Sequence, residues 1–149
     1  EIFIIQKTMK RIIIAVLCAL GLVSALDAQE KKGVMTLSSK EFKTKVYDIS
    51  AKNPEYLGSK PAIVDFYASW CGPCRAISPV LEELAKEYGD KIVIYKVDVD
   101  ASRDIAQAFG IRSIPAVLFI PMKGEAQMTV GGRSKEDFKK QIDTILLGK

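Results

Sequence analysis

The sequence has 149 residues, of which 48% are hydrophobic and 27% are charged, and its formal net charge is +4. This length accommodates one domain with its own core, and the composition is that of a globular protein rather than a disordered chain. The positive charges are interspersed with acidic residues instead of clustered, so we expect no nucleic-acid partner.

The N-terminal segment has the pattern of an export signal. Met9 is followed by Lys10 and Arg11 and then by an apolar run over residues 12–26 that ends among small residues. A run of about 15 residues suits the core of a signal peptide and is short for a transmembrane helix. We expect residues 1–8 to be upstream sequence, residues 9–28 a signal peptide and residues 29–149 the mature domain. The mature protein would then be exported to the periplasm; the alternative is a membrane anchor formed by an uncleaved leader.

The first part of the expected domain predicts a short strand, over residues 34–37, and a helix. Ser38 followed by Glu41 has the spacing of a capping box, which marks a helix start. Apolar residues recur at helical spacing as far as Ile49, and Pro54 predicts that the helix has ended by then.

Residues 62–68 predict a buried strand, because the segment is apolar on both faces. Asp65, in its middle, is the exception. A carboxylate in such a position is costly unless it is neutral, paired or hydrated, and burial raises its pKa. Asp65 is therefore either a group that exchanges protons or half of a structural ion pair.

The rest of the chain alternates between helical and extended patterns. We expect a helix over residues 73–88, a strand over 92–97, a short helix between Ser102 and Gly110, strands over 116–120 and 126–130, and a final helix after Ser134. This order predicts an α/β fold with a parallel sheet covered on both faces, to which the last two strands add an antiparallel edge.

The cysteines indicate redox chemistry. The sequence has three cysteines and no histidine. Cys18 lies in the expected leader, which leaves Cys71 and Cys74 in the mature chain. Without histidine, neither a Cys–His nucleophile nor a haem attachment motif can be built, and a zinc site would lack its usual ligands. We therefore expect no metal and no cofactor.

The position of the cysteine pair is more informative than its spacing. Cys71 follows a predicted strand and begins a predicted helix, where unpaired N–H groups and the helix dipole favour a thiolate. Cys74 lies one helical turn later, within reach of a disulfide. Cys71 can then attack a substrate disulfide, and Cys74 can resolve the mixed disulfide.

The segment around this pair resembles the active-site segment of the thioredoxin family. Residues 65–74 read Asp-Phe-Tyr-Ala-Ser-Trp-Cys-Gly-Pro-Cys, and residues 96–100, 108–115, 123–124 and 130–131 resemble family segments at similar spacing. The resemblance covers residues 34–147. It implies a thioredoxin fold, in which about four helices flank a central mixed sheet of about five strands, and the activity of a protein-disulfide reductase.

The resemblance also implies roles for single residues. Cys71 matches the nucleophile, Cys74 the resolving cysteine, Asp65 the buried acid that assists proton transfer at Cys74, and Lys96 the partner of that acid. The alternative for Asp65 is a structural ion pair with Lys96. Residues that match the substrate-binding positions are Trp70, Gly72, Pro73, Ile114, Pro115 and Gly131, with a cis peptide bond expected before Pro115.

Two departures from the family pattern stand out. Ser113 replaces a glycine that is often found beside Ile114, and the stretch of residues 50–60 is longer than the family connection. We predict a loop variation for this stretch and assign it no function.

The residues between the cysteines bear on the direction of the reaction. Gly72 and Pro73 offer no side chain that would stabilise a thiolate, so we expect a reducing poise. The predicted function is reduction of disulfides in substrate proteins outside the cytoplasm by a monomer that a membrane electron donor keeps reduced. The alternatives are a disulfide oxidase or isomerase of the same fold and a non-catalytic binding module.

Overall fold

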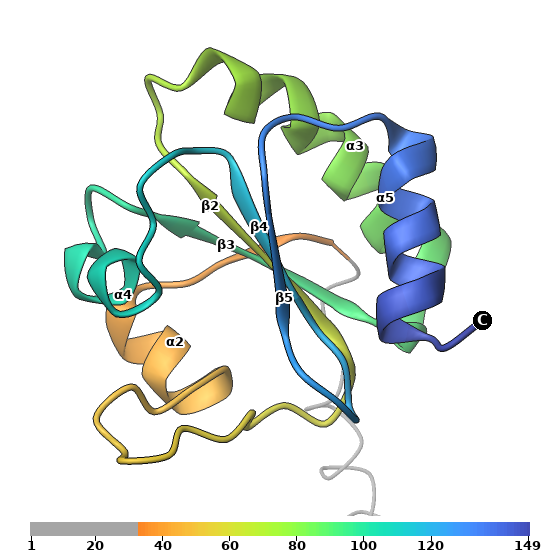
Figure 1. The fold of residues 1–149 in the computed structure, drawn as a ribbon. Coiled ribbons are helices and arrows are strands. Elements are labelled where there is room, and N and C mark those ends of the chain that lie inside the picture. Colours follow the sequence, from red (N-terminus) through yellow and green to blue (C-terminus); the bar gives the residue numbers. More distant parts are fainter. Residues whose placement is uncertain (1–32) are drawn as a thin grey trace, which may run out of the picture. The chain divides into compact units, whose positions relative to one another are not determined.

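The computed structural model describes residues 33–149, whose centre is a mixed sheet of five strands (Figure 1). The strands are β1 (Met35–Thr36), β2 (Ala62–Tyr67), β3 (Val93–Asp98), β4 (Ala116–Ile120) and β5 (Gln127–Val130). They lie in the order β1-β3-β2-β4-β5. The first three in this order are parallel, whereas β4 runs antiparallel to β2 and β5 antiparallel to β4, which confirms the predicted fold class. The leader predicted over residues 9–28, with Cys18, lies outside the described residues.

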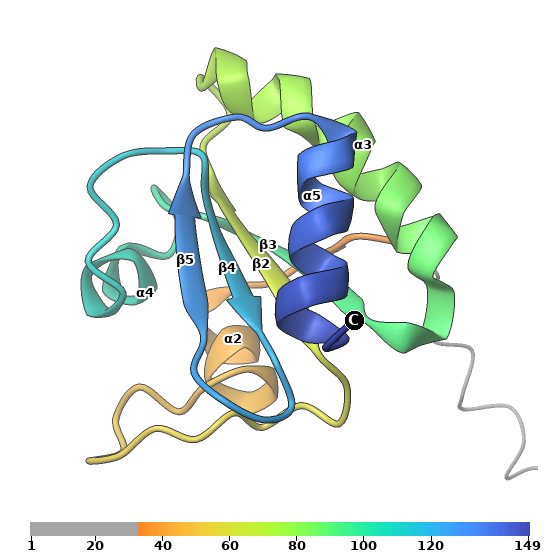
Figure 2. The same cartoon turned by 45° about the vertical axis from the view of Figure 1, so that its right-hand side comes forward.

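Helices cover both faces of the sheet (Figures 1 and 2). One face carries α3 (Gly72–Tyr88) and α5 (Lys135–Gln141), and the other carries α2 (Ser39–Lys45) and α4 (Arg103–Ala108). A 3-10 turn, η2 (Gly89–Lys91), follows α3, and a π-helical segment, η3 (Ile142–Leu146), continues α5. Within residues 33–149, no helix has the length and apolar character needed to cross a membrane.

Strand β2 divides the core into two layers. Successive side chains of a strand point to opposite faces, so Ile63 packs with α3 and α5 while Val64 and Phe66 pack with α2 and α4. All three are fully buried. The same alternation places Asp65 on the face of Ile63, beneath α3.

Helix α2 ends earlier than its apolar pattern predicts. The capping box forms as expected, since Ser38 accepts from the N–H of Glu41 and the Glu41 side chain accepts from the N–H of Ser38. The helix nevertheless stops at Lys45 and does not reach Ile49. The carbonyl of Val46 instead accepts from the N–H of Leu57 at 2.9 Å. Contact with a distant segment therefore overrides the local periodicity.

The serines at the starts of the last two helices both lie at N-cap positions, but only one of them makes a capping hydrogen bond. Ser102 lies at the N-cap of α4, but its side chain makes no capping hydrogen bond. Ser134 does cap α5, since its side chain accepts from the N–H of Asp137. The buried residues Phe138, Ile142 and Leu146 then anchor α5 and η3 to the sheet.

Candidate active site

Cys71 is the N-cap residue of α3, directly after the loop that follows β2. Its sulfur accepts the N–H of Cys74 at an N···S distance of 3.2 Å. Pro73 lies in the first turn, where its missing N–H costs no helical hydrogen bond. The N–H of Cys74 and the positive end of the helix dipole therefore face Sγ of Cys71, which favours a thiolate there when the pair is reduced.

Cys71 and Cys74 form a disulfide, with Cα atoms 5.3 Å apart. Both residues are buried and pack with Ala68. Ile114, from the loop before β4, packs against the same cluster. Segments that are far apart in the sequence thus meet at the cysteines.

Asp65 lies in the middle of β2 and is only 3% exposed. Its Oδ1 atom has no hydrogen-bond partner among the described residues. Burial raises the pKa of Asp65 to about 7, and the positive charge of Lys96 opposes this rise without cancelling it. A carboxyl group with this pKa exchanges protons readily near neutral pH.

Lys96 is the register partner of Asp65 on the adjacent strand β3. Its ammonium group lies over the ring of Tyr67, 4.3 Å from the centroid. The ion pairs found within residues 33–149 do not include Asp65 and Lys96. The structural ion pair between Asp65 and Lys96, which was the alternative, is therefore not formed. Lys96 affects the pKa of Asp65 only through its positive charge.

Trp70 lies beside Cys71 and is 66% exposed. Its Nε1–H donates to Oδ2 of Asp100 at 2.8 Å, which holds the indole in place. Sequence reasoning did not single out Asp100. The available signal was its position just after β3, because neighbouring parallel strands bring their carboxyl ends to one edge of the sheet.

The loop that faces the cysteines contains a cis peptide bond between Ile114 and Pro115, as expected. The carbonyl of Pro115 accepts the N–H of Gly131 at 2.8 Å. Gly131 has a φ of 93°, a conformation that residues with a side chain rarely adopt. Gly72 begins α3, and a Cβ atom at this glycine would meet no other atom within 4 Å.

The structure thus brings Ile114 to the disulfide and bonds Gly131 to the adjacent Pro115, while Asp65 and Lys96 lie side by side within strands β2 and β3. Arg75 was not predicted, and its Nη1 donates to the carbonyl of Ser69 at 3.1 Å, which ties the cysteine loop to α3. Among residues 33–149, no group of three or more His, Cys, Asp or Glu side chains is placed to hold a metal ion. A reversible disulfide at a helix start above a buried acid defines the class of thiol–disulfide exchange proteins.

Comparison with known proteins places the chain within that class. The thioredoxin family model matches residues 33–144. Thioredoxin of Borreliella burgdorferi is 42% identical over 109 residues, which are 72% of this chain and 93% of the relative. The chloroplastic M-type thioredoxin of Pisum sativum is 43% identical over 91 residues, which are 60% of this chain and 53% of the relative, so the chain spans about half the length of that protein.

A solved structure agrees with these sequence matches. Chloroplastic thioredoxin z superimposes with a TM-score of 0.64 at 26% identity, covering 76% of this chain and 94% of the solved one. The chain belongs to the thioredoxin family. It is a disulfide oxidoreductase of the thioredoxin type, with the Cys71–Cys74 pair as its redox centre.

Proposed function

We propose that this protein reduces disulfides of substrate proteins outside the cytoplasm. The observation that carries the proposal is the Cys71–Cys74 disulfide at the start of α3, with only Gly72 and Pro73 between the cysteines. The pattern of residues 9–28, two basic residues followed by an apolar run and small residues, supports the export of the domain.

The reaction begins with the reduced pair. The Cys71 thiolate attacks one sulfur of the substrate disulfide, which forms a mixed disulfide and releases the first substrate thiolate. Cys74 then gives its proton to Asp65, and its thiolate attacks the sulfur of Cys71. The second substrate sulfur leaves as a thiolate. Two electrons have passed to the substrate, and the Cys71–Cys74 disulfide remains.

Asp65 suits the role of proton acceptor and donor because burial raises its pKa to about 7. A carboxyl group with an ordinary pKa would be ionised throughout the neutral range and would be a poor donor. Lys96 is a positioning residue in this scheme, since its charge limits the rise in the pKa of Asp65.

The surface around Cys71 is the place where the substrate rests. The exposed indole of Trp70 lies on one side, and the loop of Ile114 and Pro115, bonded to Gly131, lies on another. Gly72 adds no side chain between this surface and the substrate. These residues contact the polypeptide on either side of the target disulfide in the proposal.

The net direction depends on the reduction potential. Gly72 and Pro73 carry no group that stabilises the thiolate form, which supports a reducing poise. A reductase outside the cytoplasm needs an electron source, and a membrane protein that reduces the Cys71–Cys74 disulfide would supply it. We expect the protein to act as a monomer. A disulfide oxidase or isomerase of the same fold is the alternative.

The reduction potential tests the direction. The purified protein is equilibrated in glutathione and dithiothreitol buffers, and the fraction of reduced pair is measured. A potential of about −270 mV, as in reducing thioredoxins, supports the proposal. A potential of about −120 mV, as in strong disulfide oxidants, would replace it with an oxidase. Mass spectrometry of the protein from exporting cells tests whether residues 9–28 are removed.

A further inference from the structure

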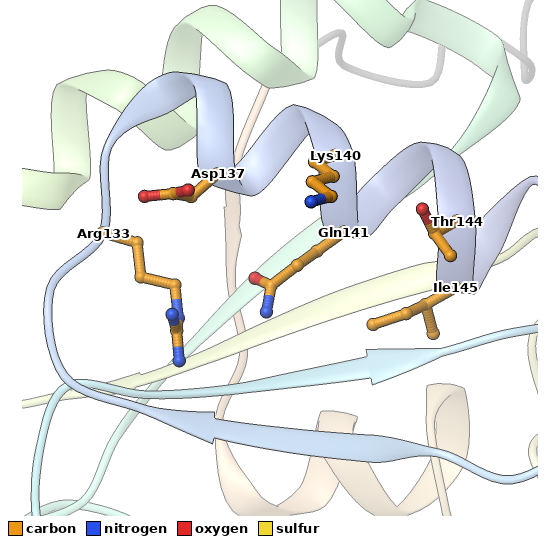
Figure 3. A pocket seen from close by; sticks show the side chains of 6 residues that line it. All are labelled: Arg133, Asp137, Lys140, Gln141, Thr144 and Ile145. Carbon is orange, nitrogen blue, oxygen red and sulfur yellow. The ribbon is translucent and has the colours of Figure 1, made fainter.

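A pocket lies on the helical segment that follows β5, and its lining does not include the cysteines. It has a volume of about 320 Å³. Six side chains line it: Arg133, Asp137, Lys140, Gln141, Thr144 and Ile145. Figure 3 shows Arg133, from the loop before α5, and Gln141 and Ile145, from the helical segment, extending toward strands β4 and β5. We call this site the α5 pocket.

The α5 pocket carries unpaired positive charge. Lys135 and Lys139, on the side of α5 that faces α3, form ion pairs with Glu83 and Glu87. The side chains of the two cations in the pocket, by contrast, have no ion pair with another residue of 33–149. The pocket's one acid, Asp137, already accepts a hydrogen bond from the Ser134 hydroxyl at 2.9 Å.

The pocket also contains a polar atom that needs a donor. Oε1 of Gln141 is buried and has no hydrogen-bond partner among the described residues. Buried polar atoms without a partner are uncommon, and a ligand that donates to them gains free energy. An anion without a hydrogen atom would pair with Arg133 but could not donate to Gln141. A complementary ligand therefore carries both a negatively charged hydrogen-bond acceptor and an N–H donor.

A polypeptide segment with an acidic side chain has this combination. Its carboxylate can pair with the guanidinium group of Arg133, for which a two-bond geometry is available. If the Gln141 side chain turns to expose its buried Oε1, one of the segment's main-chain N–H groups can donate to it. The aliphatic part of the same segment can contact Ile145, which is half-buried at the other end of the row of labelled side chains (Figure 3).

The α5 pocket is continuous with the redox site along the chain. Arg133 follows two residues after Gly131, whose N–H is bonded to the carbonyl of Pro115. Gly132, between them, packs near Ile77 of α3. A substrate that rests on the loop of Pro115 and Gly131 can thus continue along this connection to Arg133.

We propose that the α5 pocket is an auxiliary substrate site that takes an acidic side chain of a substrate protein, near the disulfide that is reduced at Cys71. This inference rests on the proposed function, since it assigns a class of substrate to the same redox site. The pocket selects disulfides that are flanked by Asp or Glu.

Two cyclic peptides test the proposal. Both contain one disulfide in the same loop, and they differ only in a tail of glutamates or of glutamines. For the wild type, we expect the KM of the glutamate peptide to be lower by about fivefold, the size of effect that an exposed ion pair supplies. Arg133→Glu should abolish this preference and leave kcat on the glutamine peptide unchanged, and Lys140→Glu should reduce it.

Lys52→Glu is the matched control. It makes the same change of charge in the connection between α2 and β2, and it should keep the preference of the wild type. If Lys52→Glu lowers the preference as much as Arg133→Glu does, the effect is one of net charge and the α5 pocket is not the site. Equal KM values of the wild type for both peptides would also overturn the inference while leaving the reductase function intact.

A binding measurement separates failure of the pocket from failure of the function. The side-chain amide signals of Gln141 are followed by NMR while a glutamate peptide without cysteines is added to the Cys71→Ser, Cys74→Ser protein. We expect these signals to shift in that protein and not after the further change Arg133→Glu. Unshifted signals would overturn the assignment of the α5 pocket as a substrate site. A failure to reduce either cyclic peptide would instead overturn the proposed function.

Discussion

Asp65 and Lys96 are register partners on parallel strands, yet the lysine ammonium group lies over the ring of Tyr67 and forms no ion pair with the acid. Burial is therefore the larger influence on Asp65 and raises its pKa to about 7. A full ion pair would have kept the carboxyl group ionised. Asp65 is therefore a buried acid that can change its protonation state near neutral pH.

The raised pKa makes stability depend on pH. Between about pH 4 and pH 7 the folded protein keeps the Asp65 proton that the unfolded chain releases, so the free energy of unfolding falls as pH rises through this window. Asp65→Asn removes the ionisation with little change of shape. We expect it to raise the free energy of unfolding by roughly 2–4 kcal/mol at pH 8 and to change it little at pH 4.

Urea denaturation at several pH values measures this effect. Asp90→Asn is the matched control, because Asp90 is exposed and should give the pH dependence of the wild type. The same fall in stability from pH 4 to pH 7 in Asp65→Asn and the wild type would show that another group is responsible.

Asp65→Asn should also slow the second step of the reaction. The variant cannot accept the proton of Cys74, and general-base catalysis of this kind contributes about 10²- to 10⁴-fold. We expect the mixed disulfide on Cys71 to accumulate, and the rate of its resolution to lose the inflection near pH 7. Rapid quench with a thiol-alkylating reagent and mass spectrometry measures the intermediate. A resolution rate equal to that of the wild type across pH 6–8 would exclude a role for Asp65 in proton transfer.

Trp70 contributes to substrate contact through a ring that Asp100 holds in place. Trp70→Ala removes the exposed ring, and Trp70→Phe keeps a ring but loses the hydrogen bond to Asp100. We expect KM for a protein disulfide to rise about tenfold in the alanine variant, since loss of a contact of this size costs 1–2 kcal/mol, and to rise less in the phenylalanine variant. Steady-state kinetics measure both. Unchanged KM in both variants would contradict substrate contact at this position.

The capping box of α2 offers a test of local stability. Ser38 accepts from the N–H of Glu41 and its hydroxyl donates to the Glu41 carboxylate at 2.8 Å. We expect Ser38→Ala to lower the free energy of unfolding by about 1 kcal/mol. Ser59→Ala is the control, since Ser59 is an exposed loop serine, and it should change stability little. Equal effects of the two substitutions in urea denaturation would show that the box does not stabilise the fold.

The order of the elements could be predicted because it depends on neighbours in the sequence. The run over residues 62–68 was apolar on both faces, and the structure places β2 at Ala62–Tyr67, in the interior of the sheet. The end of α2 could not be predicted in the same way. Its apolar spacing continued to Ile49, but a hydrogen bond from the distant Leu57 to Val46 competes with the helix there.

The same division applies to the site. The sequence by itself determined that Cys71 and Cys74 form a redox pair at a helix start, because a strand, a tight turn and a proline in the first helical turn are local features. Only the tertiary structure decided the pKa of Asp65, the contact of Ile114 with the cysteines and the hydrogen bond that holds Trp70. Burial and electrostatic interactions depend on groups that the fold brings together from distant parts of the chain, so a local pattern gives the direction of the shift in the pKa of Asp65 but not its size.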